Sequence, residues 1–220
     1  MPYSHGSKNR LTERSLPLFP AATLRDRLAR AVCRAGCLPR KELFEAWEVA
    51  RRMRRLVRGR RVVDLAAGHG LLAWAMLLLD DTSPSALCVD PRRPESAGRL
   101  ASVLEAEWPR LSGRVRFVET PLESVPLERG DVVVSAHACG ALTDAVLARA
   151  VAARVPVAVL PCCHPEPPAD VAGFDAWMPA ALAVDVGRAL ALRRAGYDVR
   201  IQAIPGDVTP KNRLIIGQPA

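Results

Sequence analysis

The stretch DLAAGHG, residues 64 to 70, decides the fold because it joins a short β-branched run to a long apolar run. The run before it predicts a strand over residues 61–65, and the run after it predicts a helix over residues 71–79. Gly68 and Gly70 then lie at a strand-to-helix turn, where the lack of a side chain lets the backbone approach a ligand. We therefore expect a nucleotide-binding turn in an α/β protein.

The alternation of strands and helices continues from this turn to the end of the chain, which is typical of a doubly wound α/β sheet. Strands are expected near Arg61–Leu65, Ala86–Val89, Val115–Val118, Val132–Ala136, Val157–Leu160, Tyr197–Ile204 and Arg213–Gly217. Helices are expected at Leu71–Leu79, Glu95–Trp108, Ala141–Ala153 and Ala180–Ala195. Seven strands, the last two joined without a helix, favour the Rossmann-like class I methyltransferase sheet, with helices on both faces, over a dinucleotide fold.

The chain before this sheet predicts a basic helical extension, so we divide it into residues 1–58 and a domain of residues 59–220. Residues 1 to about 20 are polar and aperiodic, and we expect them to be mobile or draped on the surface. Apolar spacing predicts helices over Thr23–Ala35 and Arg40–Val57. A basic stripe on the second helix is expected to point outward, and it consists of Arg51, Arg52, Arg55 and Arg58.

The composition indicates one domain with a good core, since half of the 220 residues are apolar and a quarter are charged. The longest apolar run, residues 71–79, is too short to span a membrane, and no apolar signal segment opens the chain, so we expect a soluble, cytoplasmic protein. Reduced thiols are therefore expected at all six cysteines, Cys33, Cys37, Cys88, Cys139, Cys162 and Cys163. Cys33 and Cys37 are expected to pack a helix around Gly36.

The positive charge is concentrated in the first part of the chain. Residues 1–61 carry 16 Lys or Arg against 5 Asp or Glu, whereas the rest is slightly acidic. Such an arm is typical of contact with phosphates, and RNA is the expected partner of the arginine stripe. The alternative is a compositional bias toward arginine, because only Lys8, Lys41 and Lys211 among the 31 basic residues are lysines.

Two acids flank the glycine turn and bear on the cofactor. Asp90 ends the second predicted strand, where its carboxylate can accept hydrogen bonds from both ribose hydroxyls of an adenosine. Gly68-x-Gly70-x-x-Ala73 also fits a nicotinamide dinucleotide. Asp64 favours S-adenosylmethionine (SAM) instead, because SAM lacks a pyrophosphate and carries a sulfonium and an amino group that attract a carboxylate.

Further cofactor contacts are expected from Ala66 within the turn and from the loop after the third strand. Glu119 or Thr120 in that loop can accept from the adenine amine, although either residue fits a helix cap equally well. His137 follows the fourth strand, at the same carboxyl edge of the sheet, and is expected beside the cofactor too.

The fourth and fifth strands end in polar segments, SAHACGALTD from residue 135 and PCCH from residue 161. His137 or His164 is a candidate general base for a hydroxyl acceptor, and for each a polar group satisfied by backbone is an equal alternative. Asp144, in the first turn of the next helix, and Lys211, which can hold a phosphate, are further catalytic candidates. Other side chains predicted either to line the acceptor pocket or to form an exposed pair are Asp185 and Arg188.

Cysteines in these two segments raise the question of a metal site. Cys139, Cys162 and Cys163, together with the two histidines, offer soft ligands for zinc or iron. Neighbouring residues in extended chain project to opposite sides, and no C-x-x-C supports the pair, so we predict no metal site.

The two segments also carry a family resemblance. His-Ala-Cys-Gly-x-x-Thr-Asp with a downstream Pro-Cys-Cys-His resembles the methyltransferase domain of tRNA acceptor-stem 2′-O-methyltransferases and of the glutathione S-transferase C-terminal-domain-containing protein. The likeness runs from about Lys41 to Gln218 and includes the segment TPKNR at residues 209–213, associated with bacterial members of unassigned substrate. The cysteine- and histidine-rich zinc-finger regions of the tRNA enzymes are lacking here.

The resemblance implies a SAM-dependent methyltransferase whose acceptor is RNA, either a tRNA ribose 2′-hydroxyl or a base. Two alternatives stay open. One is methylation of a small metabolite or a protein side chain, and the other is a non-catalytic protein that binds SAM or a nucleotide.

Overall fold

The computed structural model describes residues 10–167, 169 and 171–220, so the prediction for residues 1–9 lies outside the described part. Its helices are α1 Leu24–Ala35, α2 Arg40–Met53, α3 Leu71–Leu79, α4 Glu95–Glu107, α5 Ala141–Ala153 and α6 Ala180–Arg194. Its strands are β1 Arg61–Leu65, β2 Ala86–Asp90, β3 Val115–Glu119, β4 Asp131–Ala136, β5 Val157–Leu160, β6 Tyr197–Ala203 and β7 Arg213–Pro219. Short 3-10 turns η1 to η4 lie at Glu13–Leu18, Pro109–Leu111, Leu122–Ser124 and Phe174–Ala176.

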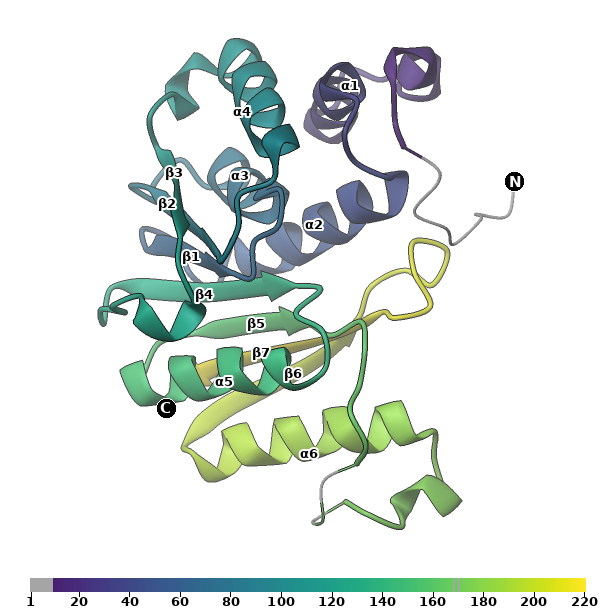
Figure 1. The fold of residues 1–220 in the computed structure, drawn as a ribbon, viewed down its shortest axis with the longest axis vertical. Helices are drawn as coiled ribbons and strands as arrows, with labels where there is room; N and C mark the ends of the chain where they lie inside the picture. Colours follow the sequence, from purple (N-terminus) through teal and green to yellow (C-terminus); the bar gives the residue numbers. More distant parts are fainter. Residues whose placement is uncertain (1–9, 168, 170) are drawn as a thin grey trace.

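The seven strands form one mixed sheet in the order β3-β2-β1-β4-β5-β7-β6 (Figure 1). Strands β1 to β5 are parallel, and β7 runs antiparallel between β5 and β6. The order in which strands are added reverses at β1, because β2 and β3 lie on one side of it and β4 pairs with it in parallel on the other side. This arrangement confirms the predicted Rossmann-like methyltransferase sheet and places the carboxyl ends of β1 and β4 side by side.

Successive residues along the strands are buried alternately in two hydrophobic cores, one on each face of the sheet. Val62, Val132 and Ala158 belong to the core shared with α1 to α4, whereas Val63 and Val133 belong to the core shared with α5 and α6. Figure 1 shows these two helical layers on either side of the sheet. Both faces are covered, which explains why the central strands are almost continuously apolar.

The N-terminal helices pack on the sheet domain as part of the first core. Thr23 caps α1 by accepting a hydrogen bond from the Asp26 backbone, and Gly36 ends α1 in a left-handed conformation with φ of 63°. Cys33 and Cys37 are buried around this end, as predicted. The described part of the first 20 residues corrects the expectation of a mobile segment, because Leu11 and Phe19 are buried in the same core.

The second helix is shorter than predicted, because α2 ends at Met53 rather than at Val57. The four stripe arginines therefore do not share one helical face, and only Arg51 and Arg52 lie within α2. The Arg52 guanidinium is half-buried, pairs with Glu48 and donates to the Ala203 carbonyl at 3.1 Å. The Arg52 side chain therefore binds other parts of the protein, which corrects the prediction that it points outward.

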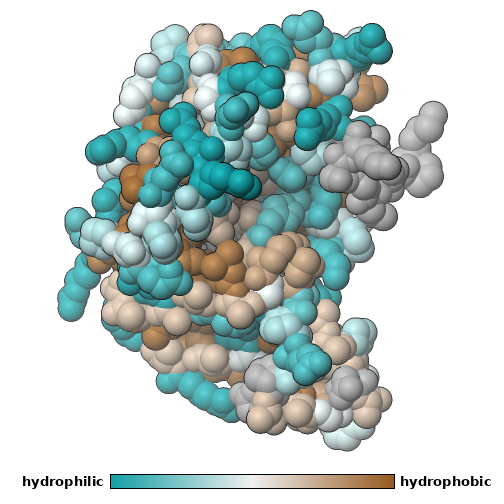
Figure 2. Space-filling view, viewed as in Figure 1, coloured by the Kyte–Doolittle hydropathy of each residue, from teal (hydrophilic) through white to brown (hydrophobic). Residues whose placement is uncertain are grey.

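Hydrophilic and apolar residues are unevenly distributed over the face drawn in Figure 2. Figure 2 shows hydrophilic residues gathered over the upper part of this face, and apolar residues gathered over the lower part around α5. The sequence of α5 explains the second observation, since it consists mostly of alanine, valine and leucine. Among the described residues, no helix is both long and apolar enough to cross a membrane.

Candidate active site

A small, partly open cavity lies at the carboxyl ends of β1 and β4, beneath the first turns of α2. Its wall combines acids, histidines and small or apolar side chains: Leu38, Glu42, Ala46, Asp64, Ala67, His69, Leu71, Leu72, Ala136 and His137. Asp64 and His137, both predicted from sequence, therefore meet in one pocket. Glu42 and His69 were not predicted, because neither lies at a position that the spacing of the glycine turn assigns to a ligand contact.

Asp64 is the buried acid of this cavity, with 2% of its surface exposed. Its carboxylate accepts one hydrogen bond, from the Ala73 backbone N–H at 3.3 Å in the first turn of α3. Burial, together with the negative charge of Asp90, raises the Asp64 pKa to about 8. A cation in the cavity would stabilise the carboxylate form, so the site fits the sulfonium and ammonium of SAM.

The two glycines of the turn serve different purposes. Gly68 has φ of 52°, and a Cβ placed on it would meet no atom within 4 Å, so its backbone faces open space. Gly70 has φ of 78°, and a Cβ there would lie 2.8 Å from the Cys88 sulfur. The expectation that both glycines keep space for a ligand therefore holds for Gly68, whereas Gly70 is required by packing against β2.

Asp90 ties the glycine turn to β2. One carboxylate oxygen accepts from the Gly68 N–H at 3.1 Å, and the other accepts from the Arg92 N–H at 3.3 Å. Ala66, the first residue after β1, has a left-handed backbone conformation with φ of 57°. The two hydrogen bonds to Asp90 fix the turn. Each Asp90 oxygen can still accept a further hydrogen bond from a ribose hydroxyl.

The adenine candidates lie at the end of β3, next to Asp90 in the sheet. Glu119 is exposed and accepts from the Arg93 N–H at 3.3 Å. Thr120 is half-buried, and its backbone N–H donates to the Asp90 carbonyl at 3.1 Å. Both residues therefore lie on the β2–β3 side of the turn, where the prediction placed them.

His137 begins the loop after β4 in a strained left-handed conformation, with φ of 70°. Its Nε2 lies 2.7 Å from Glu45 Oε2, and the Glu45 side chain is 1% exposed. Lys41 Nζ lies 3.5 Å from the other Glu45 oxygen. A buried carboxylate that holds one imidazole nitrogen leaves the second nitrogen, Nδ1, as the basic one.

Glu45 was missed by the sequence analysis. The sequence feature that could have revealed Glu45 is its position in α2. Glu45, Val49 and Met53 follow one another at intervals of four residues on the buried face of this helix. An acid in an apolar row needs a partner inside the protein. That partner, His137, comes from β4, which no local pattern in α2 reveals.

The other catalytic candidates lie outside this cavity. His164 Nε2 lies 2.9 Å from Asp185 Oδ1, and both side chains are buried. Arg188 binds Asp144 through two hydrogen bonds of 2.7 and 2.9 Å, and it also donates to Asp185 at 3.3 Å. Asp185 and Arg188 are therefore a buried network rather than an exposed pair, and this network also holds His164 and Asp144.

Lys211 is exposed in the connection between β6 and β7, at the same edge of the sheet as the cavity. Its backbone N–H donates to Thr209 Oγ1 at 3.2 Å. Lys211 does not belong to the cavity wall.

The cysteines after β4 and β5 contradict the predicted geometry. Cys162 and Cys163 do not diverge, because their sulfurs lie 3.8 Å apart, and the Cys139 sulfur lies 3.2 Å from that of Cys162. The reason is that β5 ends at Leu160, so the alternation of a strand no longer applies to the pair. Burial and the two neighbouring thiols raise the Cys162 pKa to about 12.

Comparisons with known proteins identify the family of the domain. The family model described as a methyltransferase domain matches residues 43–167. No curated protein matches the sequence.

Solved structures share the fold. An O-methyltransferase family protein from Burkholderia thailandensis is 21% identical, with a TM-score of 0.55, 96% of this chain covered and 63% of that chain covered. Human N-acetylserotonin methyltransferase, solved with SAM, is 14% identical, with a TM-score of 0.51 and coverages of 94% and 57%. Precorrin-6y C5,15-methyltransferase from Geobacter metallireducens is 15% identical, with a TM-score of 0.51 and coverages of 80% and 88%. The chain thus spans less than two thirds of the first two proteins.

The family match covers more than half of the chain and overturns the alternative of a nicotinamide-dependent enzyme. It agrees with the sheet order, the glycine turn and the acid-lined cavity. This protein therefore belongs to that family of methyltransferase domains, and S-adenosylmethionine is its cofactor.

Proposed function

We propose that this chain methylates a hydroxyl group of an RNA, with His137 as the general base. The observation that carries the proposal is the position of His137, which lies on the wall of the cavity that also contains Asp64 and 2.7 Å from the buried carboxylate of Glu45. A base beside a cofactor site is what a hydroxyl acceptor requires, because a neutral hydroxyl is a poor nucleophile.

The cofactor residues are assigned by charge and position. When bound, SAM supplies an activated methyl group on a positively charged sulfur. Asp64 and Glu42 provide the negative charge in the cavity for the cationic end, and Asp90 provides acceptors for the ribose. The open backbone at Gly68 leaves space beside them.

The proton of the acceptor moves to His137. Nε2 lies 2.7 Å from the Glu45 carboxylate, so the lone pair of Nδ1 takes the proton from the acceptor hydroxyl as the oxygen becomes nucleophilic. The Glu45 carboxylate then stabilises the imidazolium that results, and Lys41 holds the other carboxylate oxygen in place. Glu45 acts through His137 and is therefore a positioning residue.

The distribution of charge supports RNA as the acceptor class. Arg51 in the last turn of α2 and Arg55 and Arg58 beyond it are exposed. The cavity lies at the other end of this helix, where Glu42 and Ala46 line it. The 14 residues of α2 make it about 21 Å long, so an acceptor that contacts both ends must be large. A polyanion of that size matches an excess of basic side chains better than a small metabolite does.

The test is transfer of labelled methyl from SAM to total tRNA, to a small-hydroxyl library and to protein lysate. We expect incorporation into tRNA only, and expect the variant Arg51→Ala/Arg55→Ala/Arg58→Ala to weaken tRNA binding with a salt slope lower by about 2 to 3. The matched control is Arg200→Ala, an exposed arginine on β6. Transfer to small hydroxyls or protein alone would overturn the RNA proposal and retain the methyltransferase.

A further inference from the structure

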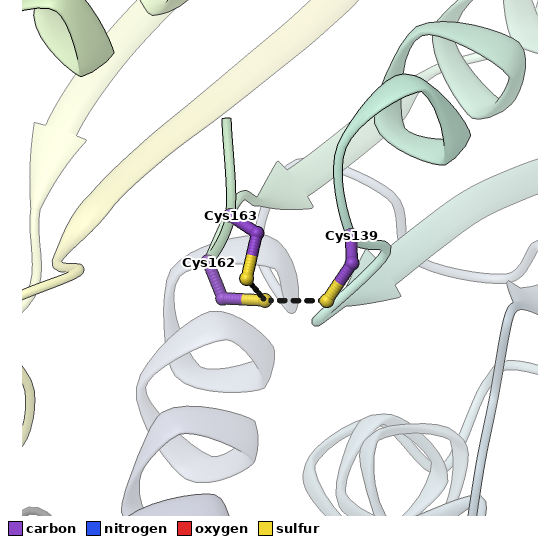
Figure 3. A group of neighbouring side chains, drawn as sticks. All are labelled: Cys139, Cys162 and Cys163. Carbon is purple, nitrogen blue, oxygen red and sulfur yellow. Dashed lines mark hydrogen bonds between the residues drawn. The ribbon is translucent and has the colours of Figure 1, made fainter. Parts of the chain in front are cut away.

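Three thiols converge at the edge of the sheet, outside the wall of the cofactor cavity. Cys139 comes from the loop after β4, and Cys162 and Cys163 come from the loop after β5 (Figure 3). The sulfurs are separated by 3.2 Å for Cys139 and Cys162 and by 3.8 Å for Cys162 and Cys163, and all three lie within 4.8 Å of one another. Three soft donor atoms from two separate loops thus point to one spot.

Backbone pairing holds the two loops in this arrangement. The strands β4 and β5 are in register up to Ala136 and Leu160, so both loops leave the sheet at the same level. Beyond the strands, the Gly140 N–H donates to the Cys163 carbonyl at 3.1 Å. Gly140 adopts φ of 59° and ψ of −130°, a conformation that only glycine reaches easily. The thiols therefore meet because of backbone geometry.

The buried ionic network on α6 supports both loops from beneath. Asp185 holds His164, the residue after the cysteine pair, at 2.9 Å. Arg188, one turn further along α6, donates to the Gly140 carbonyl at 3.0 Å, next to Cys139. Residues that orient ligand loops in this way are typical of metal sites, where the supporting shell fixes the donors in advance.

The spacing of the sulfurs fits a single ion. Thiolates bind Zn²⁺ at about 2.3 Å, which places neighbouring sulfurs about 3.8 Å apart in a tetrahedral site. We propose that Cys139, Cys162 and Cys163 bind a thiophilic metal ion, zinc in the first place, with the fourth position open to solvent. Cys139 and Cys163 are exposed, so solvent can reach an ion bound to them, and we therefore assign the fourth coordination position to solvent. Three protein ligands with one free position are typical of zinc sites that bind a further ligand.

Binding has a simple balance of protons. The three thiols lose one proton each, three Zn–S bonds form, and a water molecule or another donor takes the fourth position. The proposal goes beyond methyl transfer, because neither Asp64 nor His137 belongs to the thiol cluster. Metal binding and SAM binding are therefore separable properties of the same edge.

The experiment is titration of the reduced, metal-free protein with Zn²⁺ in competition with a chromophoric chelator, and with Co²⁺ in the absence of chelator. We expect one equivalent of Zn²⁺ per chain with a submicromolar Kd, and thiolate-to-cobalt charge-transfer absorption of a three-thiolate site. A parallel titration with Cu⁺ tests whether the other common thiophilic ion binds more tightly.

Serine variants locate the ion. Cys139→Ser, Cys162→Ser and Cys163→Ser should each weaken Zn²⁺ binding at least 100-fold, whereas Cys33→Ala, which removes a buried thiol elsewhere, should not. Circular dichroism and SAM affinity, unchanged in the serine variants, show that the fold is intact. Binding at the same affinity in Cys139→Ser would overturn the proposal. So would a reduced protein that takes up no metal and instead forms a Cys139–Cys162 disulfide on oxidation.

Discussion

The glycine turn of residues 64–70 and the pair of loops after β4 and β5 lie on the same edge of one sheet, yet they are built in different ways. The glycine turn is held mainly by its own neighbourhood, since Asp64 accepts from the first turn of the following helix and Asp90 accepts from Gly68. The loop pair is held by α6, a helix much later in the chain. Local contacts hold the glycine turn, whereas the thiol cluster depends on backbone pairing of its two loops together with long-range charged contacts from α6.

This difference has a consequence for function. Removal of a side chain on α6 should affect the thiol cluster and spare the cofactor, and removal of Asp64 should do the reverse. The pair of Glu45 and His137 shares features of both regions. His137 belongs to the loop after β4, as Cys139 does, whereas Glu45 comes from α2, which covers the cofactor cavity.

The largest effect is expected at His137. His137→Ala removes the proposed base and should lower kcat by about 10³, within the range found for general bases, while the Kd for SAM changes far less. Single-turnover methyl transfer together with calorimetry measures both quantities. In Glu45→Gln the imidazole remains but loses its carboxylate, so we expect kcat to fall by about 10-fold to 100-fold. An unchanged kcat in His137→Ala would remove it from catalysis.

The next effect concerns the loop pair. Arg188→Met leaves Asp185 buried with one cation fewer and should lower the free energy of unfolding by about 3 to 5 kcal/mol. Denaturant titration measures the loss, and Arg200→Met on the surface should stay within about 0.5 kcal/mol. At temperatures where the variant is folded, SAM affinity should be preserved and zinc affinity reduced. Equal losses of both would show that the two regions are one unit.

A smaller effect distinguishes the two glycines of the turn. Gly70→Ala meets both a positive φ and the Cys88 sulfur, so it should cost about 2 to 4 kcal/mol, whereas Gly68→Ala should cost about 1 kcal/mol for its φ alone. Thermal unfolding followed by calorimetry gives both values. Cys88→Ala in the Gly70→Ala background should restore the steric part, and failure to do so would contradict the packing explanation.

The smallest effect is a pH dependence. The Asp64 pKa, raised by burial from 3.8 to about 8, means that the free protein holds this proton at pH 7. SAM favours the carboxylate, so binding should release close to one proton at pH 7, and the Kd should fall up to 10-fold per pH unit from pH 6 to 8 and then level off. The same shift makes the free protein lose stability as the pH rises through 8. Calorimetry in buffers of different ionisation enthalpy counts the proton, and a pH-independent Kd would contradict the assignment.

The fold was predictable from the sequence almost to the residue, because apolar periodicity and turn residues are local signals. One exception is the end of α2, where Val57 continues the apolar spacing although the helix stops at Met53. Another is the segment before α1, where Leu11 and Phe19 are buried in the core. The positions of Asp64 and Asp90 around the glycine turn were predictable because both acids keep fixed spacings from Gly68. Glu45 and the convergence of Cys139 with Cys162 were not, because both depend on which strands become neighbours and how each loop leaves the sheet.

The measurement that tests the central claim most directly is calorimetric titration of SAM into the protein and into Asp64→Ala at pH 8. The cavity predicts binding with a micromolar Kd, weakened at least 30-fold in Asp64→Ala, whose fold is checked by circular dichroism. Equal SAM affinity in the two proteins would contradict the assignment of Asp64, and no binding to either would contradict the assignment of the cavity.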